Sequence, residues 1–172
     1  MTSDAQSGSR VLGSLRSADG TGIVRLEDRY DTDIEDLWSG LTEPRRLARW
    51  IAEVDGDLRL GGEFSARFTS GWEGKGRVVA CEPPRRLLVT TQATGEADEQ
   101  VIEATLTADG DKTVLAIEER GLPVEHLAAY GAGWQIHAED LAAHLAGAER
   151  CDMKTRWSEL ISAYRDQAAN LD

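Results

Sequence analysis

The sequence has little of several features that define other classes of protein. It contains two cysteines in 172 residues, which are too few for a disulfide framework or a zinc knuckle. It has 19 lysines and arginines against 31 aspartates and glutamates, a net charge of −12, so it lacks the basic face that nucleic acids or anionic membranes require. No apolar run approaches the roughly 20 residues of a membrane-spanning helix, and no charged start precedes an apolar stretch as in a signal peptide. These absences predict a soluble, acidic, cytoplasmic protein with no nucleic-acid or membrane partner.

Motifs for cofactor binding and nucleophilic catalysis are also missing. There is no G-x-S-x-G segment, and Gly71–Gly76 lacks the K-[ST] ending and the following helix of a phosphate-binding loop. His137, Asp140 and His144 follow one stripe of a predicted helix, but the two histidines stand about 10 Å apart along its axis, too far to share one ion. We therefore expect no metal, no cofactor and no catalytic set, and we interpret Asp140 and His144 as an ion pair on the helix flank.

What the sequence does contain is a series of clear periodicities. Residues 1–9 are rich in Ser, Gly and Asp and predict a disordered tail, and residues 10–170 predict one domain. Apolar runs on both sides of Asp19-Gly20 predict a hairpin whose second strand reaches Tyr30. Asp33 is the expected N-cap of a helix that ends before Pro44, and Pro44 is expected to start a second short helix.

The rest of the chain changes from strand to helix periodicity. Apolar and polar residues alternate at 63–68, and further strands are predicted at about 75–82, 86–93, 100–107 and 113–119. After Pro123 the period of 3.6 residues returns in a long helix that ends near Gly147, and a final amphipathic helix carries Trp157 and Tyr164. Strands grouped together, with helices before and after them, predict an α+β protein.

Five short motifs in this order resemble those of one superfamily. They are Thr42-Glu43-Pro44 with Leu47 and Trp50, Leu60-Gly61-Gly62-Glu63-Phe64, Glu82-Pro83-Pro84-Arg85-Arg86-Leu87, Gly133-Trp134 with Leu141 and Leu145, and Trp157 with Tyr164. This pattern resembles the SRPBCC superfamily, the START-like, polyketide-cyclase-like group, and within it the bacterial proteins related to the activator of the heat-shock-protein-90 ATPase. The resemblance implies the helix-grip fold, in which a curved antiparallel sheet wraps around a long C-terminal helix. It also implies a cavity between sheet and helix, where the superfamily holds lipids, hormones or polyketides.

The long helix presents an aromatic and partly polar face to the predicted sheet. At 100° per residue, Tyr130, Trp134, Leu141 and His144 all lie within about 60° of His137. This face is either a cavity wall or ordinary core packing with satisfied polar tips. We expect the cavity to be lined by Phe64, Phe68, Trp72, Tyr130, Trp134, His137 and Leu141.

Adjacent carboxylates end one predicted strand. Glu118 and Glu119 face opposite sides of the sheet, so at most one of them points inward. Either one could act on a ligand from the inner face, but the usual interpretation of such a pair is a solvated strand end.

Three hypotheses for function follow. The first is a protein, monomeric or homodimeric, that binds a small apolar or amphipathic ligand without turnover. The second is a co-chaperone-like protein that modulates a chaperone through its surface. The third is an enzyme of the cyclase or dehydratase type that uses His137 or Tyr130 as its acid or base.

Overall fold

One antiparallel sheet organises the part of the chain that the structure, a computed structural model, describes, residues 11–171. The predicted tail, residues 1–9, lies outside this range. Along the chain, the strands are β1 (Gly13–Ala18), β2 (Thr21–Tyr30), β3 (Ala52–Gly56), β4 (Glu63–Phe68), β5 (Glu73–Glu82), β6 (Arg86–Ala93), β7 (Gln100–Asp109) and β8 (Lys112–Leu122). Their order across the sheet is β1-β2-β8-β7-β6-β5-β4-β3, so β1 and β3 are the two edges.

The helices connect and cover this sheet. They are α2 (Ile34–Thr42), α3 (Pro44–Trp50), the 3-10 turn η1 (Val124–His126), α4 (Leu127–Leu145) and α5 (Met153–Ala169). Asp33 caps α2 by accepting a 2.8 Å hydrogen bond from the Asp36 amide, and Pro44 stands at the start of α3, as predicted. The two short helices carry the chain from β2 to the far edge of the sheet, where β3 begins.

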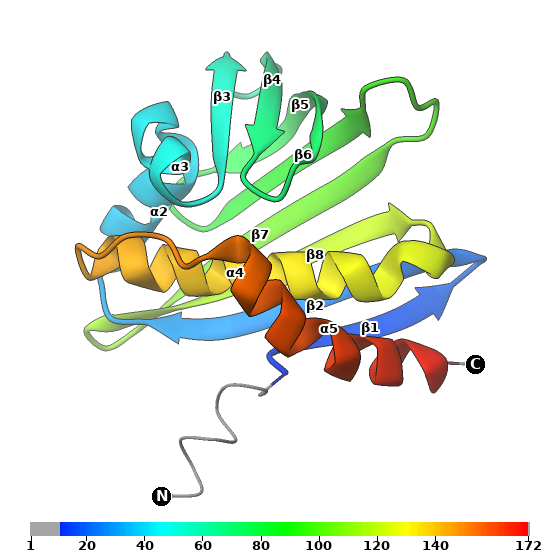
Figure 1. Cartoon of the computed structure of the whole chain (residues 1–172). Coiled ribbons are helices and arrows are strands. Elements are labelled where there is room, and N and C mark those ends of the chain that lie inside the picture. Colours follow the sequence, from blue (N-terminus) through cyan, green and yellow to red (C-terminus); the bar gives the residue numbers. More distant parts are fainter. Residues whose placement is uncertain (1–10, 172) are drawn as a thin grey trace, which may run out of the picture.

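The sheet curves around α4, which lies across its concave face (Figure 1). This arrangement is the predicted helix-grip α+β fold. Pro123 precedes the long helix, and Gly147 follows it with a positive φ of 77°, a conformation that favours glycine after a helix C-terminus. Among residues 11–171, no helix is long and apolar enough to cross a membrane.

The long helix is buried on nearly all sides along its middle. Residues 131–138 are all buried, because the sheet covers one side of α4 and α5 packs on another (Figure 1). The Tyr164 hydroxyl, on α5, accepts a 2.9 Å hydrogen bond from the Gly13 amide of β1 and donates one of 2.6 Å to Gln135 Oε1 of α4. Gly131 lies so close to Tyr164 that a Cβ there would stand 2.6 Å from its ring. The final helix therefore joins the edge strand to the long helix.

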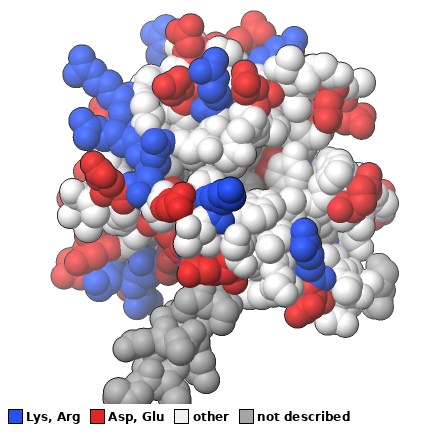
Figure 2. All heavy atoms as spheres, in the orientation of Figure 1, with Lys and Arg blue, Asp and Glu red and all other residues white. Residues whose placement is uncertain are grey.

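The edge strand β3 is one element that the periodicity did not predict. Its sequence, Ala52-Glu53-Val54-Asp55-Gly56, contains two acids and a glycine, and only Ala52 is fully buried. The strand forms because its backbone pairs with β4 in register, Ala52 opposite Phe68, and tertiary pairing overrides local β-propensity at such an edge. Charged side chains cover much of the visible outer surface, whereas the surface between α4 and the strands above it is largely uncharged (Figure 2).

Candidate functional site

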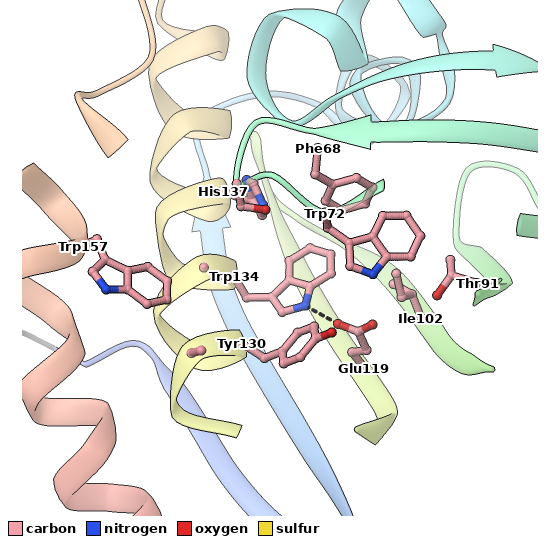
Figure 3. Close-up of a pocket in the computed structure, with 12 residues that line it drawn as sticks. Phe68, Trp72, Thr91, Ile102, Glu119, Tyr130, Trp134, His137 and Trp157 are labelled. Carbon is pink, nitrogen blue, oxygen red and sulfur yellow. Dashed lines mark hydrogen bonds between the residues drawn. The ribbon is translucent and has the colours of Figure 1, made fainter. Parts of the chain in front are cut away.

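A cavity of about 220 Å³ lies between α4 and the inner face of the sheet (Figure 3). The sheet side comes from β4, the turn after it, β6, β7 and β8, and the helical side comes from α4 with one residue of α5. Its lining residues are Phe68, Ser70, Trp72, Thr91, Ile102, Glu119, Ala129, Tyr130, Gly133, Trp134, His137 and Trp157. Five of the ten aromatic residues in the chain therefore surround this one space.

A buried carboxylate, Glu119 of β8, stands in the wall of this cavity. The side chain belongs to a residue only 5% exposed, and its Oε1 accepts a 2.7 Å hydrogen bond from the Trp134 indole. Burial raises the pKa of Glu119 to about 7, although the Trp134 hydrogen bond acts in the opposite direction. The Tyr130 hydroxyl points toward the same carboxylate (Figure 3), and burial together with the negative charge of Glu119 raises the pKa of Tyr130.

Two further polar groups of the lining have no hydrogen-bond partner among the described residues. They are Nδ1 of His137 and Oγ1 of Thr91, and both atoms are buried. His137 is 3% exposed, and burial lowers its pKa to about 4, so the imidazole is neutral at pH 7. Its ring contacts Phe68 and Trp134 edge-on, with ring centroids 5.7 Å away in each case. Since buried polar atoms are normally hydrogen-bonded, unpartnered ones beside a cavity mark places where a ligand can bind.

A second, apolar cavity of about 120 Å³ lies deeper, between the sheet and α2–α3. Its wall includes Leu47 and Trp50 of α3 and Phe64 of β4. Phe68 and Trp134 line both cavities, as does Ile102, so these side chains form the partition between an outer, partly polar space and an inner, apolar one.

The structure brings most of the predicted cavity residues to these two spaces. Phe68, Trp72, Tyr130, Trp134 and His137 line the outer cavity, and Phe64 lines the inner one. Leu141 lines neither and is fully buried in the core. That exception follows from the helix position, one turn beyond His137, where α4 packs against its neighbours without a gap.

Of the alternatives for the two glutamates, the structure has the one with an inward carboxylate, and the interpretation of a solvated strand end is wrong for Glu119. On β8, Thr113, Leu115, Ile117 and Glu119 are all buried, so the period of two places Glu119 on the inner face. Glu118 points outward and forms ion pairs with arginines. The apolar residues two and four positions earlier were the signal that could have identified Glu119.

Six other residues of the outer cavity were missed, for different reasons; two of them, Ala129 and Gly133, are small residues of α4 with no chemical group to mark them. Thr91 follows the buried Val89 by two positions on β6, so the same parity could have identified it. Ile102 is an ordinary strand residue, and nothing local distinguishes it from core packing. Trp157 lines the cavity because of where α5 docks, which is a tertiary property, and Ser70 lies in the turn after β4.

The predicted ion pair on the flank of α4 is also wrong. Asp140 Oδ1 accepts a 2.9 Å hydrogen bond from the Cys151 amide, and His144 Nε2 accepts one of 3.1 Å from Arg46. Asp140 thus ties the segment after α4 to that helix, while His144 faces α3. Within residues 11–171, no group of three His, Cys, Asp or Glu side chains is placed to hold a metal ion.

The sequence from Asp31 to Ala146 matches the family described as activator of Hsp90 ATPase homolog 1-like protein. The chain belongs to this family. The match runs from the start of α2 to the end of α4 and confirms the SRPBCC-type resemblance of the motifs. The residues within this family match therefore supply nearly all of the outer cavity, whereas Trp157 lies beyond the match. No curated protein sequence matches this member of the family.

Solved structures of the same architecture extend the comparison. CalU16 from Micromonospora echinospora is 27% identical, covers 92% of this chain and 97% of its own, and superposes with a TM-score of 0.76. DynU16, described as a putative protein in the dynemicin biosynthetic locus, is 26% identical over 77% of this chain and 49% of its own, with a TM-score of 0.69. MLL2253 from Mesorhizobium loti is 26% identical over 74% of this chain and 98% of its own, with a TM-score of 0.65. The fold of this activator-like family member is thus shared with solved proteins over nearly its whole length.

Proposed function

We propose that this protein binds a small apolar or amphipathic molecule non-covalently between its sheet and α4. The outer cavity carries the proposal, because five of its twelve lining residues are aromatic and a few polar atoms lie in its wall. Small-molecule sites combine these two properties: apolar burial supplies affinity, and sparse polar groups set orientation. The outer cavity holds about 220 Å³, below the roughly 300–1,000 Å³ usual for such sites, and the inner cavity behind the partition holds about 120 Å³, so the ligand is small.

Native mass spectrometry of the protein purified from its source organism tests this proposal. We expect a retained small molecule in the wild type and its loss in Gly133→Leu. A Cβ at Gly133 would meet no protein atom within 4 Å, and Gly133 lines the cavity, so leucine fills the space without displacing the core. Ala142→Leu, on the exposed side of the same helix, is the matched control and should retain the molecule. Equal spectra for wild type and Gly133→Leu would contradict the proposal.

The buried carboxylate favours a second candidate, an acid–base enzyme of the cyclase or dehydratase type. A general acid or base works best when its pKa lies near the operating pH, and burial raises the pKa of Glu119 to about 7. His137, with its pKa lowered to about 4, is the weaker base of the two. Incubation of the retained molecule with wild type and Glu119→Gln, followed by mass spectrometry of the product, tests this candidate; conversion at the same rate by both would exclude the role of Glu119.

The family description supports a third candidate, a chaperone-modulating protein. Addition of the purified protein to a chaperone ATPase assay tests it directly. No change in rate at saturating protein would remove this candidate, and it would leave the ligand-binding proposal untouched.

A further inference from the structure

The outer cavity contains an acid without a basic partner. Among the described residues, the one hydrogen bond to the Glu119 carboxylate comes from the Trp134 indole, and no lysine or arginine forms an ion pair with it. The neighbouring His137 is neutral because burial lowers its pKa to about 4. A buried carboxyl group without a cationic partner is neutral over part of the pH range, and a cationic ligand can supply the charge that keeps Glu119 ionised.

The aromatic wall favours the same kind of ligand. Trp72, Tyr130 and Trp134 lie around the end of the Glu119 side chain (Figure 3). The faces of tryptophan and tyrosine rings carry negative electrostatic potential and attract ammonium groups at distances up to about 6 Å. An aromatic enclosure with one carboxylate in its wall therefore fits an organic cation better than a neutral or anionic head group.

Two unpartnered polar atoms on different sides of the lining can accept hydrogen bonds from a ligand (Figure 3). His137 Nδ1 and Thr91 Oγ1 are buried beside the cavity and have no partner among the described residues. Both can accept a hydrogen bond, and a primary ammonium has three N–H donors and no acceptor. A carboxylate ligand would instead bring a second negative charge next to Glu119.

The net charge of the protein also favours a cationic ligand. The chain carries a formal charge of −12, and a strongly negative protein raises the local concentration of cations and their rate of association. The apolar inner cavity lies behind the partition of Phe68, Ile102 and Trp134, so the apolar part of an elongated molecule reaches it only if these side chains move.

We propose that the ligand is an amphipathic organic amine, whose protonated nitrogen binds the Glu119 carboxylate in the outer cavity while its apolar part extends toward the inner cavity. This inference rests on the proposed ligand-binding function and names its chemical class. It assigns Glu119 as the residue that determines specificity, with the aromatic wall as the second determinant.

Calorimetric titration with three probes of equal chain length tests the proposal: n-octylamine, 1-octanol and octanoate. The titrations are made near pH 8, where octylamine is protonated and Glu119 is largely ionised. We expect the wild type to bind octylamine at least about tenfold more tightly than 1-octanol, which corresponds to about 1.4 kcal/mol of binding free energy. Octanoate should bind most weakly, because its carboxylate repels that of Glu119. In Glu119→Gln this preference should fall below about twofold, with octanol binding unchanged, because glutamine keeps an oxygen that accepts from Trp134.

Glu118→Gln is the matched control. It removes the same charge from the same strand, but on the outer face, where Glu118 pairs with Arg16 and Arg120. We expect this variant to keep the full preference for the amine, and an equal loss in both variants would show general attraction to the acidic surface and overturn the proposal. If octanol or octanoate binds as tightly as octylamine, the proposal that the ligand is an amine is overturned, while the proposed ligand-binding function stands. Failure of all three probes to bind the folded wild type would contradict both.

Discussion

Replacement of Glu119 by glutamine should change how the stability of the protein depends on pH. The carboxyl titrates near 7 in the folded chain and near 4.5 in the unfolded chain. Between these values the folded state binds more protons, so the wild type loses the stabilisation from this group as the pH rises from about 4.5 to 7. At 1.36 kcal/mol for each pH unit that separates the two pKa values, the loss amounts to about 3 kcal/mol.

His137 opposes this change in the wild type. Burial lowers its pKa from 6.5 to about 4, so its contribution is present above pH 6.5 and is lost as the pH falls toward 4. The stabilisation from His137 that is lost on acidification is again about 3 kcal/mol, and its dependence on pH has the opposite sign to that of Glu119. We therefore expect the wild type to show little net pH dependence from these two groups between about pH 4.5 and 6.5, and each single variant to reveal the slope of the other group.

Urea unfolding of the wild type, Glu119→Gln and His137→Phe across this range measures both slopes. Relative to wild type, Glu119→Gln should gain about 3 kcal/mol between pH 4.5 and 7.5, and His137→Phe should gain a similar amount as the pH falls from 6.5 to 4. Glu118→Gln, on the outer face of β8, is the control that removes a charge from the same strand outside the cavity. The reasoning is refuted if the difference between Glu119→Gln and wild type is the same at both ends of the range, because the carboxyl would then titrate alike in both states.

Three further substitutions test the packing around α4. Gly133→Ala should stabilise the protein by about 0.5–1 kcal/mol, since alanine is the better helix former and its Cβ would meet nothing within 4 Å. Gly131→Ala, two residues earlier, should destabilise it by about 1–2 kcal/mol, because that Cβ would stand 2.6 Å from the Tyr164 ring; urea midpoints that shift in the same direction for both would contradict the packing. Tyr164→Phe should cost about 2 kcal/mol, because the buried Gly13 amide loses its acceptor; a thermal midpoint equal to that of the wild type would show that this hydrogen bond contributes no net stability.

The sequence predicted the elements wherever periodicity was strong. The cap at Asp33, the proline at the start of α3 and the long helix ending before Gly147 are local signals that the structure confirms. The edge strand β3 was missed because Glu53, Asp55 and the adjacent glycine carry no strand pattern; its conformation comes from pairing with β4. Local sequence could therefore predict the layers but not the full edge of the sheet.

The candidate site was predictable in part, and the missing part was its chemistry. The aromatic residues of α4 followed from helical spacing, and their contacts with the sheet followed from the helix-grip resemblance. To predict that Glu119 points inward, the alternation that buries Leu115 and Ile117 had to be extended by two residues to the end of the strand. The contribution of Trp157 required the docking position of α5, which no local pattern contains.

The hydrogen bond between Gly13 and Tyr164 has a consequence for the time at which the cavity can form. It joins residues 151 positions apart, and contacts of such long sequence separation form late and slow down folding. Trp157, from the same final helix, contributes to the cavity wall. The wall of the cavity is therefore complete only after α5 has been synthesised and has docked on α4, and until then the side of α4 that α5 covers is exposed to other chains.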